Sequence, residues 1–437
     1  MKGVGKYGIS KYLSIAVFLT AISCSLLLIL PNSNISSIVN ILLSILLLSF
    51  PESYIPLIFT SSVSRSISIF GFSATHYYVI VLLFYVSIKS KCRFYKGVGK
   101  SWNYLMMFLV WLLICSLLSV TGTMTNFVRI FIMIVICHIC ASSKILGINE
   151  SLYFLKKTAP IILTIILAKL LMFPVPYVIE GNYSILVLNS VSKVINPNQL
   201  AQLIAVILFL LVTTLKENNK ILSIACIVFS IIILFLLKSR TSLYATLAVS
   251  ASYLLFVSGR IKFKHKLIIA CCAILFVALQ LLTAIQLDST GTITHKESKE
   301  MSIASLVASG GSGRIFTWKV AISDIIPQHP QLGIGLGSEN YEALGYEYDC
   351  DNLFLDLIVE TGFIGFALFF VFYIITTLEV HRGNDKTGKI IKYLLFMILC
   401  FGIGETVFDS FFMWSIVFLC YIYLFSNNQS YQYGKSY

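Results

Sequence analysis

The chain has 437 residues, of which 58% are hydrophobic and only 12% are charged. A soluble domain carries about 25% charged residues, so the composition excludes an ordinary water-exposed surface, and the many apolar side chains exclude intrinsic disorder. Unbroken apolar runs approach the ~20 residues that a helix needs to cross a bilayer, whereas a transmembrane β-barrel would show ~10-residue segments of alternating polarity. We therefore predict an all-α polytopic membrane protein, with residues 1–437 forming a single integral membrane domain.

The net charge of +13 is concentrated in short segments beside the apolar runs. These basic segments lie near residues 2–11, 89–100, 144–157, 260–266 and 382–392. Clusters of this kind are typical of cytoplasmic loops, which explains the basic balance better than nucleic-acid binding does. We expect no nucleic-acid partner.

The predicted spans alternate so that every basic segment falls on one side. The first run, 12–30, is long and lacks an A-x-A-like cleavage site, so we expect a retained span rather than a signal peptide. Four N-terminal crossings, at 12–30, 36–50, 54–71 and 73–88, would give fourteen spans in all, and a re-entrant segment near Pro51 would give twelve. The later predicted spans are 103–121, 125–141, 159–178, 198–215, 221–237, 241–258, 267–286, 352–379, 391–408 and 410–426.

Residues 287–351 form the one long segment without a predicted span. They carry nine acidic residues against four basic ones, and a net charge of −5 in a +13 protein fits an external loop. Long loops in compact proteins are usually functional, so the active region is expected here. Of the eleven cysteines only Cys350 lies in this loop, and a single external thiol predicts no disulfide framework.

Two patterns stand out in residues 310–337, which read GGSGRIFTWKVAISDIIPQHPQLGIGLG. An apolar stripe at helical spacing predicts an amphipathic helix on the membrane surface that Pro327 ends; its members are Ile315, Trp318, Ile322 and Ile325. The glycines at 333, 335 and 337 follow no strand–helix unit, so they indicate a tight turn back to the membrane rather than a dinucleotide-binding loop.

The next span begins within YDCDNLFLDLIVETGFIGFALFF, residues 348–370. Asp351 lies at its start, where the carboxylate could be the helix N-cap, and a capping carboxylate at the water boundary could also accept a proton. Glu360 would lie about 13 Å further along the helix. An acid at that depth usually lines a cavity or pairs with a cation, and Lys169 is one candidate partner for Glu360 or Glu405.

Together these features resemble the bacterial O-antigen ligase/polymerase superfamily, continuously from about residue 196 to 370. The matching pieces are NPNQLA at 196–201, KSRTSL at 238–243, SGR at 312–314 followed by Trp318, HPQLGIGLG at 329–337, DN at 351–352 and ETGFIG at 360–365. The resemblance implies a GT-C-like glycosyltransferase architecture of about 12–14 transmembrane helices in the cytoplasmic (inner) membrane. Residues 287–351 would form its large periplasmic loop and bear the active face.

One departure from the family pattern bears on the activity. The ligases carry a histidine directly before the asparagine, where this chain has Asp351. This favours a polymerase of the Wzy type, which joins oligosaccharide repeats carried on undecaprenyl diphosphate into O-antigen or capsular polysaccharide. The implied reaction is attack of an acceptor hydroxyl on the anomeric carbon, with lipid diphosphate leaving and no cofactor required. Membrane lipid, a chain-length regulator and a flippase are the further partners implied.

The implied chemistry gives the candidate residues their roles. Asp351 would be the general base, or would stabilise the oxocarbenium-like charge of glycosyl transfer. Arg314 and Arg240 would bind the diphosphate, because a guanidinium contacts phosphate bidentately; each could instead be a headgroup anchor. The expected substrate-binding residues are Lys238, Asn352, Asn198, Trp318, Tyr348, Asp349 and Glu360.

Structural alternatives remain for several of these residues. Asn198 could cap its helix, and Trp318 could belong to a membrane-interface belt. Glu405 and Asp409 share a helix face and could position a cation or the acceptor. The six histidines show no paired ligand spacing, so we predict no metal site.

Two other functions compete with the polymerase. A ligase would transfer the finished chain to lipid A core or protein, and the histidine expected of it is replaced by Asp351. A flippase or transporter would often show internal repeats around a midplane site. The chain shows no convincing repeat, and its chemistry is concentrated in one loop, which favours an enzyme.

Overall fold

A computed structural model describes residues 5–30, 33–63, 67–91, 99–172, 197–213, 220–237, 239–257, 314–346, 350–383, 385–405, 408 and 410–433. The N-terminal part contains α1 (Gly5–Ile29), α2 (Asn34–Leu47), the 3-10 turn η1 (Pro51–Ser53), α3 (Tyr54–Ser61), antiparallel strands β1 (Ser68–Ile69) and β2 (Phe72–Ser73), and α4 (Ala74–Ser90). The middle part contains α5 (Gly99–Leu117), α6 (Thr125–Ser142), α7 (Ile148–Met172), α8 (Pro197–Thr213), α9 (Lys220–Leu236) and α10 (Arg240–Phe256). The C-terminal part contains α13 (Arg314–Val320), the π turn η2 (Ala321–Ile325), α14 (Ile326–Gln328), α15 (Ser338–Ala343), α16 (Leu353–Arg382), α17 (Lys386–Gly402) and α18 (Phe411–Tyr433).

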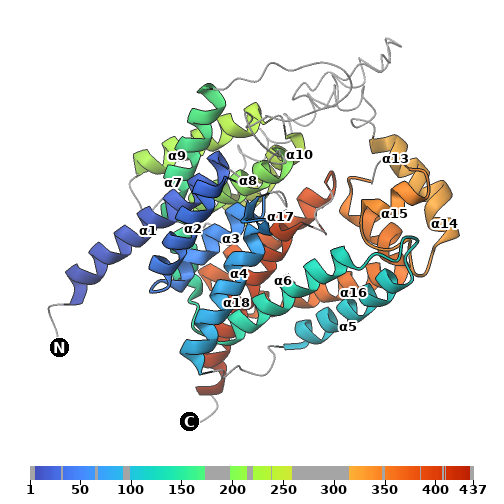
Figure 1. Cartoon of the computed structure of the whole chain (residues 1–437), viewed down its shortest axis with the longest axis horizontal. Helices are drawn as coiled ribbons and strands as arrows, with labels where there is room; N and C mark the ends of the chain where they lie inside the picture. Colours follow the sequence, from blue (N-terminus) through green and yellow to red (C-terminus); the bar gives the residue numbers. More distant parts are fainter. Residues whose placement is uncertain are drawn as a thin grey trace.

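The described chain is an all-α polytopic membrane protein, as predicted. Five of its helices are long and apolar enough to cross a bilayer by length and composition, and six shorter apolar helices accompany them. The long helices pack into one bundle, and α13, α14 and α15 gather at one end of it, beyond the ends of α5, α6 and α16 (Figure 1). The predicted span 267–286 lies outside the described residues.

Contacts between helix ends show that the spans alternate in direction. Glu379, near the end of α16, accepts hydrogen bonds from the backbone N–H groups of Lys100 (2.6 Å) and Ser101 (3.4 Å) at the start of α5. At the other end of the bundle, the His76 ring near the start of α4 lies 3.4 Å from the carbonyl oxygen of Arg129 near the start of α6. We call the end with Lys100 the basic end and the end with α13–α15 the loop end. This alternation agrees with the predicted one.

The prediction of a helical span over 54–71 is wrong. The helix ends at Ser61, where the hydroxyls of Ser61 and Ser62 donate to carbonyls of the preceding turn, at 3.1 and 2.7 Å. The chain nevertheless connects both ends of the bundle. Glu52 accepts from Gly147 N (3.2 Å) at the basic end, and Phe70, just before α4, lies at the loop end. Because Glu52 and Phe70 lie at opposite ends of the bundle, the structure supports four N-terminal crossings rather than a re-entrant segment.

The predicted span 159–178 also begins earlier than expected. Its helix α7 starts at Ile148, so Lys156 and Lys157, expected in a basic loop, lie within the helix. The Lys157 ammonium lies 5.7 Å from the centre of the Tyr153 ring one turn away. A lysine that lays its alkyl chain along the helix can keep its charge near the membrane surface, which explains how the helix tolerates it.

The amphipathic stripe in the loop is only partly right. Helix α13 leads into the π turn η2, and a π turn shifts the phase of all side chains after it. Ile325 is buried, as predicted, and so is Ala321, whereas Ile322, predicted to share the apolar face, is 58% exposed. Pro327 lies within the last helical turn, α14, instead of ending the helix before it.

Candidate functional site

Helix α16 is broken at Gly362, where the backbone has φ 67° and ψ 179°. A break frees backbone groups that cannot stay unpaired inside a membrane protein. Residues 330–335 of the loop replace the lost helical bonds. The replacement hydrogen bonds run from Ile334 N to Val359 O (2.8 Å), from Gly335 N to Glu360 O (3.1 Å) and from Phe363 N to Pro330 O (2.9 Å). The predicted tight turn at the three glycines is thus the segment that docks into the broken helix.

Glu360 belongs to this docked segment. Its side chain is buried, and Oε1 accepts a hydrogen bond from Gly337 N at 3.0 Å. The side chain of Lys169, its predicted partner, lies outside the described residues. Glu360 thus holds the loop against α16, and its role in substrate binding stays a prediction.

The loop is also fastened to the connection between α5 and α6. Asn340, at the start of α15, accepts hydrogen bonds from Thr121 N (3.0 Å) and from Thr121 Oγ1 (2.9 Å). Val120 N donates to the carbonyl oxygen of Ile334 at 3.1 Å. Residues 330–341 are therefore bonded on two sides, by α16 and by the α5–α6 connection.

The helix start next to Asp351 differs from the prediction. The N-cap of α16 is Asn352, not Asp351: Asn352 Oδ1 accepts from the backbone N–H groups of Phe354 (3.0 Å) and Leu355 (3.1 Å). Its Nδ2 donates to the carbonyl oxygen of Ile403 at 3.0 Å. Asp351 itself is half-buried and has a left-handed backbone, φ 48°. A left-handed residue cannot be the extended residue that an N-cap requires, which is the reason for the correction.

Sequence reasoning missed Asp356, a buried carboxylate that accepts three hydrogen bonds. Asp356 is 1% exposed, and its two oxygens accept from the backbone N–H groups of Cys350 (3.1 Å) and Asn352 (3.0 Å). The hydroxyl of Tyr341 donates to Asp356 Oδ1 at 3.2 Å. An acid in the first turn of a helix, within an otherwise apolar segment, was the signal that could have identified it.

Tyr341 and Trp318 tie the loop helices to the residues beside Asp351. Burial, with the nearby Asp356 carboxylate as the next cause, holds the pKa of Tyr341 well above its usual value, so the hydroxyl remains a donor. Trp318 Nε1 donates to the carbonyl oxygen of Cys350 at 2.8 Å, and the half-buried ring packs against the small apolar cluster of the loop that includes Ile325. A sugar-stacking role for Trp318 stays a prediction.

A second group of candidates lies at the same end of the bundle. Asn198, the second residue of α8, donates from Nδ2 to Glu405 Oε2 at 2.9 Å. Glu405 is buried and follows Ile403, the residue whose carbonyl accepts from Asn352. The structure thus brings Asn198, Glu405 and Asn352 together across α8, α17 and α16.

Helix α10 adds its first residue, Arg240, to this end. Tyr393, early in α17, donates to Ser252 O late in α10 at 3.4 Å, so the start of α10 lies toward the end of α17. The side chains of Arg240 and Arg314 lie outside the described residues, although the backbone of Arg314 opens α13 one turn before Trp318. Lys238, Tyr348, Asp349 and Asp409 also lie outside them.

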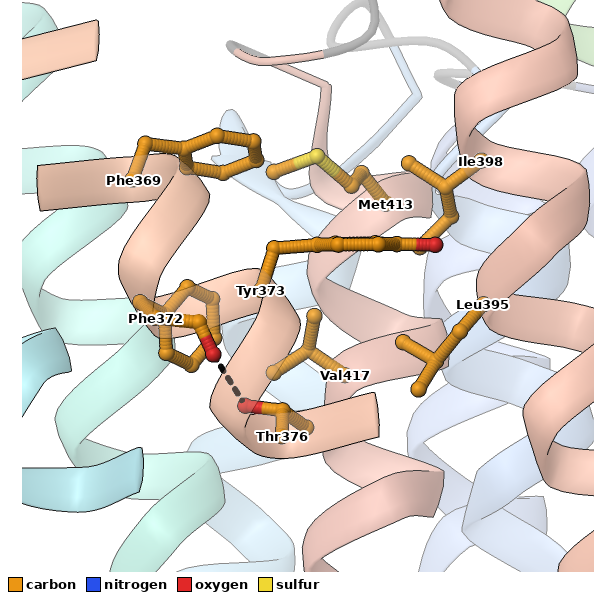
Figure 2. Close-up of a pocket in the computed structure, with 8 residues that line it drawn as sticks. All are labelled: Phe369, Phe372, Tyr373, Thr376, Leu395, Ile398, Met413 and Val417. Atoms are coloured by element: carbon orange, nitrogen blue, oxygen red, sulfur yellow. Dashed lines mark hydrogen bonds between the residues drawn. The ribbon is translucent and has the colours of Figure 1, made fainter. Parts of the chain in front are cut away.

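The pocket in Figure 2 lies away from these polar residues, between α16, α17 and α18. Its lining residues are Phe369, Phe372, Tyr373, Thr376, Leu395, Ile398, Met413 and Val417. The hydroxyl of Thr376 donates to the carbonyl oxygen of Phe372 on its own helix (2.8 Å), and none of the eight is charged. Its free volume of about 10 Å³ is roughly what one water molecule requires, so we do not assign a glycan to it. Within the described ranges no group of three or more His, Cys, Asp or Glu side chains could hold a metal ion.

Part of this site lies in a region that matches a known protein family. Residues 225–370 match the model of the O-antigen ligase family. The matched region begins in α9 and ends within α16, so it includes the start of α10, the loop helices, Asp351 and the break at Gly362. The match supports membership of the O-antigen ligase/polymerase superfamily. A comparison with curated proteins gives no match.

Proposed function

On the premise that the chain is a member of the O-antigen ligase/polymerase superfamily, we propose that it is a glycosyltransferase that polymerises undecaprenyl-diphosphate-linked oligosaccharide repeats. The reaction takes place at the extracytoplasmic face of the cytoplasmic membrane and builds O-antigen or capsular polysaccharide. A multi-pass membrane protein acting in O-antigen assembly is what the family match supports; the choice of polymerase is our inference.

The observation that carries the choice is Asp351. It stands where the family's ligases have histidine, and the structure holds its backbone in a left-handed conformation between Cys350 and Asn352, whose N–H groups both bond to Asp356. Residues kept in sparsely populated backbone conformations cluster at active sites. A carboxylate there can accept the proton of an acceptor hydroxyl.

In the proposed reaction the hydroxyl of the terminal sugar of one lipid-linked repeat attacks the anomeric carbon of the donor chain. Asp351 takes the hydroxyl proton as the new glycosidic bond forms, and the bond between the anomeric carbon and the lipid diphosphate breaks. The diphosphate leaves with the bonding electron pair. Arg314 and Arg240 neutralise the charge that develops on its oxygens, since guanidinium groups bind phosphate bidentately.

Reconstitution of the purified protein with lipid-linked repeats tests the proposal. Wild-type protein should produce a ladder of chain lengths. Because general-base catalysis contributes about 10²–10⁴-fold, Asp351→Asn should lower the rate by at least ~100-fold. Asp324→Asn, which removes an exposed carboxylate from η2 of the same loop, is the matched control and should leave the rate unchanged.

Arg314 gives an independent test in cells. Arg314→Ala should abolish polymer at normal protein levels, and Arg314→Lys should retain little of it, because an ammonium cannot make the bidentate contact. The length distribution of the surface glycan on a gel is the measurement. Full polymer in the alanine variant would remove Arg314 from the site.

The ligase is the second candidate, because the matching family is described by that activity. Deletion of the gene distinguishes the two. Loss of a polymerase leaves surface glycan as single repeats, whereas loss of a ligase leaves long chains on the lipid carrier. An unchanged length ladder would contradict both, and would leave the transporter hypothesis to be tested by reconstitution.

A further inference from the structure

We propose that Asp356 and Tyr341 are positioning residues that act through Asp351, fixing the direction in which its carboxylate meets the acceptor. This inference rests on the proposed function and deepens it. Asp356 lies within the first turn of α16 and is too buried to touch a substrate. Its contacts are instead with the chain on both sides of Asp351.

Two backbone N–H groups, one on each side of Asp351, converge on a single carboxylate. The N–H groups of Cys350 and Asn352 flank Asp351 in sequence, and they bond to different oxygens of the Asp356 carboxylate, at 3.1 and 3.0 Å. Asn352 O in turn accepts from Asp356 N at 2.8 Å. One side chain thus fixes the peptide groups on both sides of Asp351.

Further bonds complete the fixation. The carbonyl of Cys350 accepts from Trp318 Nε1, and the side chain of Asn352 donates to Ile403 O. A left-handed backbone is unfavourable for any residue with a Cβ, although Asp and Asn tolerate it best. Asp351 therefore stays in this conformation because its neighbours are bonded, and Asp356 supplies two of those bonds.

Tyr341 connects this arrangement to the loop. It comes from α15, it is 2% exposed, and its hydroxyl donates to the Asp356 oxygen that also accepts from Cys350. Asn340, its neighbour in sequence, is bonded to Thr121 at the α5–α6 connection. Docking of the loop is thereby linked to the orientation of the Asp356 carboxylate and, through it, to Asp351.

The test measures polymerisation by the full-length reconstituted protein with lipid-linked repeats. Asp356→Asn keeps the shape of the side chain but presents an NH₂ group to one of the two backbone donors. A misplacement of about 1 Å can cost about 100-fold in rate, so kcat should fall by up to ~100-fold while KM changes less than ~3-fold. Tyr341→Phe removes only one bond and should lower kcat by about tenfold or less.

A double-mutant cycle separates positioning from general stabilisation. Asp351→Glu is the reference, because it retains a carboxylate and leaves measurable activity. If Asp356 acts through Asp351, adding Asp356→Asn to this variant should cost little further activity, since groups that act as a unit are not additive. Multiplied losses, with KM changed as much as kcat, would overturn the inference.

The remaining outcomes are also decisive. If Asp356→Asn fails to fold, Tyr341→Phe carries the same cycle, because it preserves both the carboxylate and the ring. Full activity of Asp351→Asn would defeat the role of Asp351 in the proposed function. If the Asp351→Asn variant is inactive while the Asp356→Asn and Tyr341→Phe variants are fully active, the positioning inference is wrong and the proposed function stands.

Discussion

Replacement of Gly362 by alanine is expected to release the docked loop from α16. A Cβ at this position would meet the backbone carbonyl of Gln331, which belongs to the docked segment. The angles φ 67° and ψ 179° also lie in a region that is essentially restricted to glycine. Alanine therefore cannot keep both the break and the loop in place.

The size of the effect follows from these contacts. Holding alanine in the glycine conformation costs about 1–3 kcal/mol. Restoring a regular helix instead would sacrifice the three loop-to-helix backbone bonds and the Glu360–Gly337 bond, each worth about 0.5–1.5 kcal/mol. Since either route is unfavourable, docking should weaken by about 2 kcal/mol, or roughly 30-fold in the docked-to-released ratio.

Hydrogen exchange of the protein in lipid nanodiscs measures this weakening of loop docking directly. Protection of the amides of Ile334 and Gly335, which donate to α16, should fall about 30-fold. Gly345→Ala is the matched control: Gly345 also has a positive φ, +85°, but its Cβ would meet nothing within 4 Å. It should leave those two amides protected. Unchanged protection in folded Gly362→Ala would refute the reasoning.

Two further substitutions test the start of α16. Asn352→Ala removes the N-cap and the bond to Ile403, and should lower the free energy of unfolding by about 1–2 kcal/mol, measured as a lower thermal midpoint. Asn352→Asp keeps a capping oxygen and should lose less stability. Equal losses in the two variants would contradict the capping role. Trp318→Phe leaves the Cys350 carbonyl without its Trp318 donor, at a cost of about 1–3 kcal/mol. The variant should therefore be cleaved faster by trypsin at the exposed Lys319. Cleavage at the wild-type rate would show that the bond does not hold the loop.

Hydropathy and basic clusters were sufficient to predict the helical class and the alternation of the spans, because both depend on properties averaged over many residues. They could not predict α3. A window average over residues 54–71 does not locate the end of a helix at Ser61. In the loop, Ile322 was predicted on the buried face but is exposed, and the π turn that includes it was not predicted.

The sequence motifs identified candidate residues of the site but not the contacts that these residues make. The helix start at residues 351–352 was predicted, but its N-cap is Asn352 rather than Asp351, because Asp351 has a left-handed backbone that tertiary bonds maintain. Asp356 was overlooked because its importance lies in contacts with Tyr341 and Cys350, which no local pattern reveals. The role of Gly362 likewise depends on the loop that docks beside it.

The break in α16 has a consequence for the height of the chemistry above the bilayer. The uncharged residues 363–378 form about 24 Å of helix, less than the ~30 Å hydrocarbon core. Residues 353–361, before the break, add up to about 13 Å, of which about 6 Å would complete the core and the rest would lie at headgroup level. Asp351 would then lie near the outer surface of the headgroup layer. A lipid diphosphate held at headgroup level would lie close to it, as attack on the carbon that carries the diphosphate requires.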